Sequence, residues 1–122
     1  MIKQQVELVG IDDLIEEEVK VKVNGIYLDC FAGNCPFALQ VGHKYDVVFS
    51  YSDFEIEQSE DEECSIEKLN NSYSYKINGS LNNGVINSIV AISDDYLLDS
   101  YGYLDGMTVS MIVERLDIEF LK

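Results

Sequence analysis

The chain has 122 residues, of which 47% are hydrophobic and 25% are charged, the composition of one ordinary globular domain. Twenty-three acidic residues against eight lysines and arginines give a net charge of −15. This charge repels phosphate backbones and anionic headgroups, so it argues against a nucleic-acid or membrane partner. No apolar run approaches the ~20 residues that cross a bilayer, and no signal-peptide core follows the first residue. We therefore expect a single cytoplasmic domain over residues 1–122.

The first third of the chain predicts strands joined by turns. Residues 2–9 alternate as a strand, and residues 12–17 predict a turn or a short helix. In the sequence VKVKV-NG-IYLDCF that follows, Asn24-Gly25 is a favoured type I′ hairpin turn. A two-residue turn places six apolar residues on one face of the hairpin. It pairs Val23 with Ile26, Val21 with Leu28 and Val19 with Cys30, and it sets Lys22 opposite Tyr27 and Lys20 opposite Asp29.

The next segments predict a short strand over residues 37–41 and a longer one over residues 45–57. The apolar positions of the longer strand change phase by one residue between Tyr51 and Phe54. This change predicts a β-bulge or a sharp bend near residues 52–53. Past it, three acidic side chains are expected to point away from the apolar side: Asp53, Glu55 and Glu57.

The acidic residues 59–69 predict either a short helix, with Ser59 and Glu62 at capping-box spacing, or an acidic loop. Residues 73–77 alternate as a strand, and residues 82–84 form a turn.

The last third begins with residues 85–92, which are apolar on both sides and predict a central strand. Residues 93–101 predict one helical turn that ends at Gly102. The alternating runs 107–113 and 116–120 are out of phase, so we expect a bulge or a tight corner between them, at Glu114–Arg115.

These elements amount to about seven to nine short strands with little helix, which defines an all-β fold. The two architectures that fit are a small antiparallel barrel, OB-like with a Greek key, and a compact β-sandwich. Phase changes within long strands favour the barrel, because local bends allow a sheet to curl.

No arrangement of residues predicts catalysis, so we expect no enzyme, no cofactor and no metal centre. The only histidine, His43, lies in a Gly-His-Lys turn, and no nucleophile, phosphate-loop or dinucleotide motif is present. The acids between Asp94 and Asp105 lack the EF-hand spacing. The odd count of three cysteines, without CxxC, fits reduced thiols. Cys30 is expected in the core, whereas Cys35 and Cys64 lie in expected loops without an assigned role.

The acidic residues are clustered, and tyrosines accompany them. Eight acids and no base lie between Asp53 and Glu67, and a second acidic group between Asp94 and Asp105 is interleaved with tyrosines. Tyrosine is a typical anchor residue of protein interfaces, although many of the eight tyrosines also suit half-buried strands. The candidate partner-binding residues are Tyr51, Asp53, Glu55, Glu57, Glu60, Asp61, Glu62, Glu63, Glu67, Asp94, Asp95, Tyr96, Asp99, Tyr101 and Tyr103.

Such a surface suits a basic protein partner, because opposed fields raise association rates. In the run from Asp53 to Glu67 and in the segment SDDYLLDSYGYLDG, the chain resembles bacterial immunity proteins of contact-dependent growth inhibition and related polymorphic toxin systems. The resemblance lies in composition and character. It implies an antitoxin-type protein that binds a basic cognate toxin, expected to be a nuclease domain, one to one and occludes its active or substrate-binding site.

Two other functions fit the same charge. A nucleic-acid mimic of the anti-restriction or phage type would space its acids along an elongated face and inhibit several unrelated DNA-binding proteins. A non-catalytic accessory β-module would use its charge only to stay soluble.

Overall fold

The computed structural model describes residues 2–12, 17–33 and 38–121. The predictions made for residues 13–16, for Cys35 and for Phe37 lie outside this part of the chain. The elements follow in the order β1 (Gln4–Ile11), β2 (Glu18–Val23), β3 (Ile26–Phe31), β4 (Lys44–Gln58), β5 (Ser65–Lys68), β6 (Tyr75–Asn82), β7 (Val85–Asn87), β8 (Ala91–Ser93), α1 (Asp95–Ser100), the 3-10 helix η1 (Gly102–Leu104) and β9 (Thr108–Phe120).

Five strands close into a barrel, which confirms the all-β prediction and selects the barrel over the sandwich. The hydrogen-bonded order is β3-β2-β1-β4-β9, and a short parallel pairing of Cys30 with Leu116 joins β3 to β9 and completes the circle. Strands make up 59% of the described residues. The barrel is OB-like, because a three-stranded meander is closed by two later strands in a Greek-key arrangement.

The β2–β3 hairpin forms as its sequence predicts. Val23 pairs with Ile26, Val21 with Leu28 and Val19 with Cys30. Asn24 and Gly25 adopt positive φ angles of 49° and 85°, as a type I′ turn requires.

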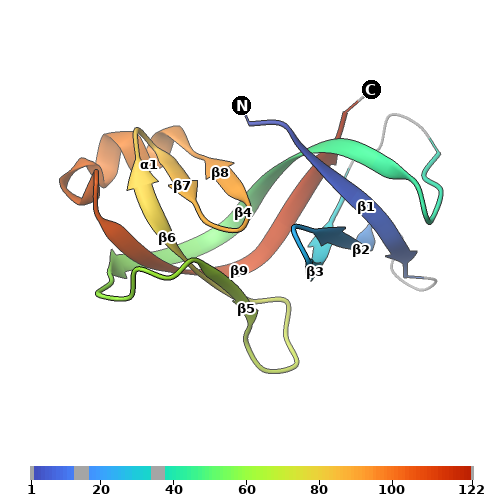
Figure 1. Ribbon diagram of the computed structural model, residues 1–122, viewed down its shortest axis with the longest axis horizontal. Helices are drawn as coiled ribbons and strands as arrows, with labels where there is room; N and C mark the ends of the chain where they lie inside the picture. Colours follow the sequence, from blue (N-terminus) through green and yellow to red (C-terminus); the bar gives the residue numbers. More distant parts are fainter. Residues whose placement is uncertain (1, 13–16, 34–37, 122) are drawn as a thin grey trace.

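The long strands β4 and β9 extend beyond the barrel and carry a second group of strands (Figure 1). β6 pairs with β9, β7 and β8 continue the sheet, and β5 pairs with β6. We refer to residues 53–114 as the second lobe and to the rest of the chain as the barrel lobe. One continuous core runs through both, from Phe49 and Phe120 in the barrel lobe to Ile77, Ile86 and Ile92 in the second lobe.

The two phase changes lie opposite each other in the β4–β9 pair and form a bend. Ser52 pairs with Arg115 and Phe54 with Val113, so the register is unchanged and no residue is inserted. Asp53 instead adopts a left-handed φ of 40°. Of the predicted alternatives, the sharp bend is therefore present and the bulge is not. A bulge occurs elsewhere, between Leu8 and Gly10 in the β1–β2 pairing.

Two predictions were wrong in detail, and one pair of alternatives is decided. Residues 85–92 do not form one central strand: β7 and β8 make a hairpin in which Ile86 pairs with Ile92. Each strand of this hairpin thus buries an isoleucine in the core. Two short buried strands therefore give the run the same apolar composition that one central strand would have. Of the two alternatives for residues 59–69, the acidic loop is present over residues 59–64 and the helix is not. The unexpected element is β5, in which Ile66 is buried opposite Ile77. Residues 38–41 are not a strand.

Two further predictions are confirmed near the end of the second lobe. Asn83 and Gly84 turn the chain between β6 and β7, with φ angles of 54° and 75°. The expected helical turn is α1, which ends before Gly102 and is followed directly by η1.

Candidate functional site

Five aromatic side chains from β4, α1 and η1 form a connected cluster on the second lobe and its border with the barrel. Tyr51 and Phe54 lie edge to face with ring centroids 5.2 Å apart. Phe54 contacts Tyr96 at 6.0 Å and Tyr101 at 5.8 Å, and Tyr101 contacts Tyr103 at 6.0 Å. We call these residues, Tyr51, Phe54, Tyr96, Tyr101 and Tyr103, the aromatic cluster.

The bend at Asp53 and the start of α1 bring the cluster together. Asp94 caps α1, because its Oδ1 accepts a hydrogen bond from the Tyr96 backbone N–H at 3.0 Å. Its Oδ2 accepts a 2.5 Å hydrogen bond from the Tyr51 hydroxyl. Burial and this hydrogen bond to Asp94 raise the pKa of Tyr51. The tyrosine therefore stays protonated and ties strand β4 to the helix.

An open hollow of about 330 Å³ lies within this arrangement. Its lining residues are Tyr51, Asp53, Phe54, Asp94, Tyr96 and Tyr101. The Asp53 side chain is exposed, and within the described part of the chain it has no hydrogen-bond or ion-pair partner. The hollow thus combines aromatic rings with one unpaired carboxylate.

Exposed apolar side chains lie on α1 and η1, which also contribute rings to the aromatic cluster. Tyr96, Leu98 and Tyr103 are 54%, 49% and 70% exposed. They lie in a stretch, residues 77–114, that contains no lysine or arginine. Exposed aromatic anchors in such an acidic setting resemble the centre of a protein interface.

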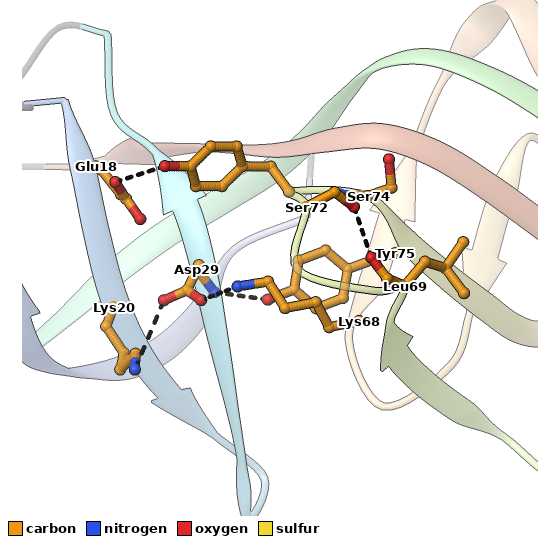
Figure 2. Close-up of polar contacts among 9 residues, drawn as sticks. Glu18, Lys20, Asp29, Lys68, Leu69, Ser72, Ser74 and Tyr75 are labelled. Atoms are coloured by element: carbon orange, nitrogen blue, oxygen red, sulfur yellow. Dashed lines mark hydrogen bonds and ion pairs between the residues drawn. The ribbon is translucent and has the colours of Figure 1, made fainter.

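Three of the cations are held at the junction between the lobes. Asp29 on β3 receives both Lys20 and Lys68, and its backbone N–H donates to the Tyr75 hydroxyl at 2.8 Å (Figure 2). Arg115 pairs with Asp117 at 2.8 Å and lies over the Phe31 ring. These contacts neutralise cations at the junction between the lobes, away from the aromatic cluster.

The structure brings only part of the predicted binding surface together. Of the two acidic segments, Tyr51 and Asp53 from the first meet Asp94, Tyr96 and Tyr101 from the second. Tyr103 joins them through Tyr101. Asp95 and Asp99 are exposed residues of α1.

The remaining acids of the first segment lie apart from the hollow. Glu55 and Glu57 line a different depression, with Ser110 and Ile112. The acids of the loop after β4 are exposed, and Glu67 lies opposite Lys76 in the register of β5 and β6. The loop acids are Glu60, Asp61, Glu62 and Glu63.

As expected, Asp53, Glu55 and Glu57 are all exposed, and they alternate with half-buried Phe54 and Ile56. Asp53, which has a left-handed φ of 40°, lines the hollow with its neighbour Phe54, whereas Glu55 and Glu57 line the other depression. Phe54 is not among the binding residues predicted from the sequence, because the alternation of the strand predicts only that it lies on the apolar side. Its change of phase relative to Tyr51 was the available signal.

Among the described residues, no three His, Cys, Asp or Glu side chains gather closely enough to hold a metal ion. Burial raises the pKa of the Cys30 thiol and keeps it protonated. His43 is exposed, as is Cys64. Within the same part of the chain, no helix has the length and apolar character needed to cross a bilayer.

The arrangement defines an OB-like barrel with an acidic second lobe that carries an aromatic hollow. A family model described as "Uncharacterised conserved protein UCP019853" matches residues 2–121, so the chain belongs to that family. The match spans both lobes. No curated protein and no solved structure matches the chain.

Proposed function

We propose that this protein is a non-catalytic inhibitor of the immunity or antitoxin type. It binds a basic toxin domain, a nuclease, one to one and occludes its active or substrate-binding site. The second lobe is the docking side, and the protein acts in the cytoplasm.

The observation that carries the proposal is the placement of exposed tyrosines inside the most acidic part of the molecule. Tyr96 and Tyr103 offer large apolar contact areas. The acids around them supply a long-range field that accelerates encounter with a cationic partner. Inhibition needs no chemistry from the inhibitor, because carboxylates form charge-assisted hydrogen bonds with the cationic groups that would otherwise hold phosphates.

An OB-like barrel by itself suggests binding of single-stranded nucleic acid. Function does not follow from fold, and the net charge of −15 opposes any polyanion. A basic protein is therefore the better-matched partner.

The first experiment is affinity capture from the source cell, followed by mass spectrometry and a nuclease assay. We expect one basic protein at stoichiometric level, whose nuclease activity stops when this protein is added. Association should slow as salt rises, because screening weakens the attraction. Recovery of only acidic proteins, or no inhibition of the captured protein, contradicts the proposal.

Matched tyrosine variants locate the docking side. Tyr103→Ala should weaken capture of the partner by about tenfold or more, as truncation of an interface anchor does. Tyr27 on β3 is the control, because it is 59% exposed but belongs to the barrel lobe. Tyr27→Ala should leave capture unchanged, and the reverse pattern would place docking on the barrel.

The same capture separates the other two functions. Inhibition of several unrelated DNA-binding proteins would indicate a nucleic-acid mimic. A partner whose binding is insensitive both to salt and to charge reversal at Glu60, Glu62 and Glu63 would indicate an accessory module.

A further inference from the structure

We infer that the hollow within the aromatic cluster receives one arginine side chain of the partner. This inference rests on the proposed function and names the chemistry of the contact. Its evidence is the shape of the hollow, its unpaired carboxylate and, among the described residues, the absence of a cationic side chain from its lining.

The walls of the hollow are suited to a flat cation. Four rings line it, from Tyr51, Phe54, Tyr96 and Tyr101, and their mutual contacts hold them in place. Aromatic faces attract cations electrostatically, and the attraction strengthens when the cation is withdrawn from water. At about 330 Å³ the hollow is large enough for a side chain but not for a folded segment.

The two carboxylates have different roles. Both oxygens of Asp94 already accept hydrogen bonds, from Tyr51 and from the α1 backbone. Asp53 has no partner among the described residues and is exposed at the rim. Asp53 is therefore the group that pairs with an incoming cation, and Asp94 keeps the rings in position.

The backbone of Asp53 supports this assignment. Its φ of 40° lies in the left-handed region, in the middle of a long strand where other residues are extended. Aspartate and asparagine tolerate this conformation better than most residues, but it still costs energy. Strained residues of this kind concentrate at binding sites. Here the strained residue lines the hollow together with the rings.

No lysine or arginine of the described residues lines the hollow. The only arginine, Arg115, is engaged with Asp117 and Phe31. The two lysines of the second lobe are Lys68, which is paired with Asp29, and Lys76, which lies on β6 opposite Glu67. The site thus remains available to a cation from outside.

Arginine fits better than lysine. A guanidinium group is planar, stacks on aromatic rings and can bind a carboxylate through two parallel hydrogen bonds. An ammonium group is compact and more strongly hydrated, so it gains less from a ring-lined hollow.

The test uses short peptides of glycine and serine that carry one arginine, one lysine or one citrulline, which has nearly the shape of arginine without its charge. Binding is followed by NMR titration of the full-length protein. We expect the arginine peptide to shift the amide signals of Asp53, Tyr96 and Tyr101. The lysine peptide should bind several-fold more weakly, and the citrulline peptide should cause no saturable shift.

Variants separate the charge of Asp53 from its backbone conformation. Asp53→Asn keeps a residue that tolerates the left-handed region but removes the charge, and it should weaken the arginine peptide about tenfold. Asp99→Asn on α1 removes a charge of the same lobe outside the hollow and should change binding less than twofold. An unchanged spectrum outside the site shows that each variant is folded.

Every result decides between the alternatives. Equal binding of arginine and citrulline peptides, shifts away from the hollow, or an Asp53→Asn variant that binds normally would overturn the inference. Equal binding of lysine would overturn the choice of arginine. If the peptide binds but no basic protein is captured, the proposed function fails and the site stands. If a basic partner is captured and the peptide does not bind, only the arginine site fails.

Discussion

The two lobes are nearly equal in length but very different in charge. The second lobe contains thirteen acidic and two basic residues, a net charge of −11. The barrel lobe contains ten acidic and six basic residues, a net charge of −4. Most of the acid excess therefore belongs to one side of the molecule, which is also the side with the aromatic cluster.

The lobes also differ in the contacts that hold them in place. The barrel is completed by backbone hydrogen bonds around five strands. The second lobe is attached through β4 and β9 and through side-chain bonds to the barrel. The Gln4 amide makes two hydrogen bonds with the backbone of Ala91, and Asn24 donates to the Ile89 carbonyl at 2.7 Å. The comparison indicates a scaffold with a lobe docked firmly on it, rather than two independent units.

The strongest test of this view is to remove a core side chain from each lobe. Phe49→Ala in the barrel should cost about 3–5 kcal/mol, and Ile86→Ala in the second lobe about 2–5 kcal/mol. Because one core joins the lobes, urea unfolding followed by circular dichroism and by tyrosine fluorescence should show one shared transition in both variants. A separate early transition in Ile86→Ala would show that the second lobe unfolds alone.

A pair of glycines tests how tightly each lobe is packed. A Cβ on Gly79 would lie 2.3 Å from the Asn87 carbonyl oxygen, whereas a Cβ on Gly10 would lie 3.8 Å from the nearest atom, on Lys20. Gly79→Ala should therefore cost at least about 1–3 kcal/mol, and Gly10→Ala less than about 0.5 kcal/mol. Equal costs in chemical denaturation would contradict the close approach of β6 and β7.

The junction between the lobes should weaken at alkaline pH. Burial, more than the nearby charge of Asp29, raises the pKa of Tyr75 to about 12, from an ordinary value near 10. The folded state holds this proton more firmly than the unfolded state does. The protonated hydroxyl therefore contributes its full share to the free energy of unfolding below pH 10, and this contribution is lost as the pH rises towards 12. The free energy of unfolding should fall over this window.

Tyr75→Phe is the control for that window. At neutral pH it should cost about 1–3 kcal/mol, because the Asp29 backbone N–H loses its acceptor. The alkaline decline should be shallower in this variant than in the native chain. An identical decline would mean that other groups cause it.

The smallest expected effect concerns the charge of the loop after β4. Replacing Glu60, Glu62 and Glu63 with glutamine should stabilise the protein by roughly 0.5 kcal/mol at low salt, because it relieves repulsion within the second lobe. The gain should vanish in 0.5 M salt, at which screening is strong. Glu119→Gln in the barrel lobe should have almost no effect, and an equal gain there would show that the repulsion is not local.

The sequence predicted local features well where one rule dominated. Asn24-Gly25 defined both the turn and the register of its hairpin, because few other turns suit that pair and the apolar alternation agrees with it. The helical turn of α1 was recognisable from its position before Gly102. Residues 85–92 were misread, because two short buried arms have the same composition as one buried strand.

The sequence predicted most residues of the candidate site, but it did not predict which of them lie together. Composition identified Tyr51, Asp53, Tyr96 and Tyr101, but it also included Glu55 and Glu57, which lie in another depression. The difference depends on which distant segment lies beside each side chain: residues 94–101 lie beside Asp53, whereas β9 lies beside Glu55 and Glu57.

The amino-acid sequence by itself determined the charge, the all-β class and the β2–β3 hairpin, since these depend on composition and on neighbouring residues. The tertiary structure alone decided that the barrel closes between β3 and β9 and that residues 45 positions apart meet around one hollow, as Tyr51 and Tyr96 do. These contacts depend on the path of the whole sheet. The phase change near Asp53 in β4 alters which side chains share a face. Only the folded chain shows that a sharp bend, and not a bulge, accommodates it.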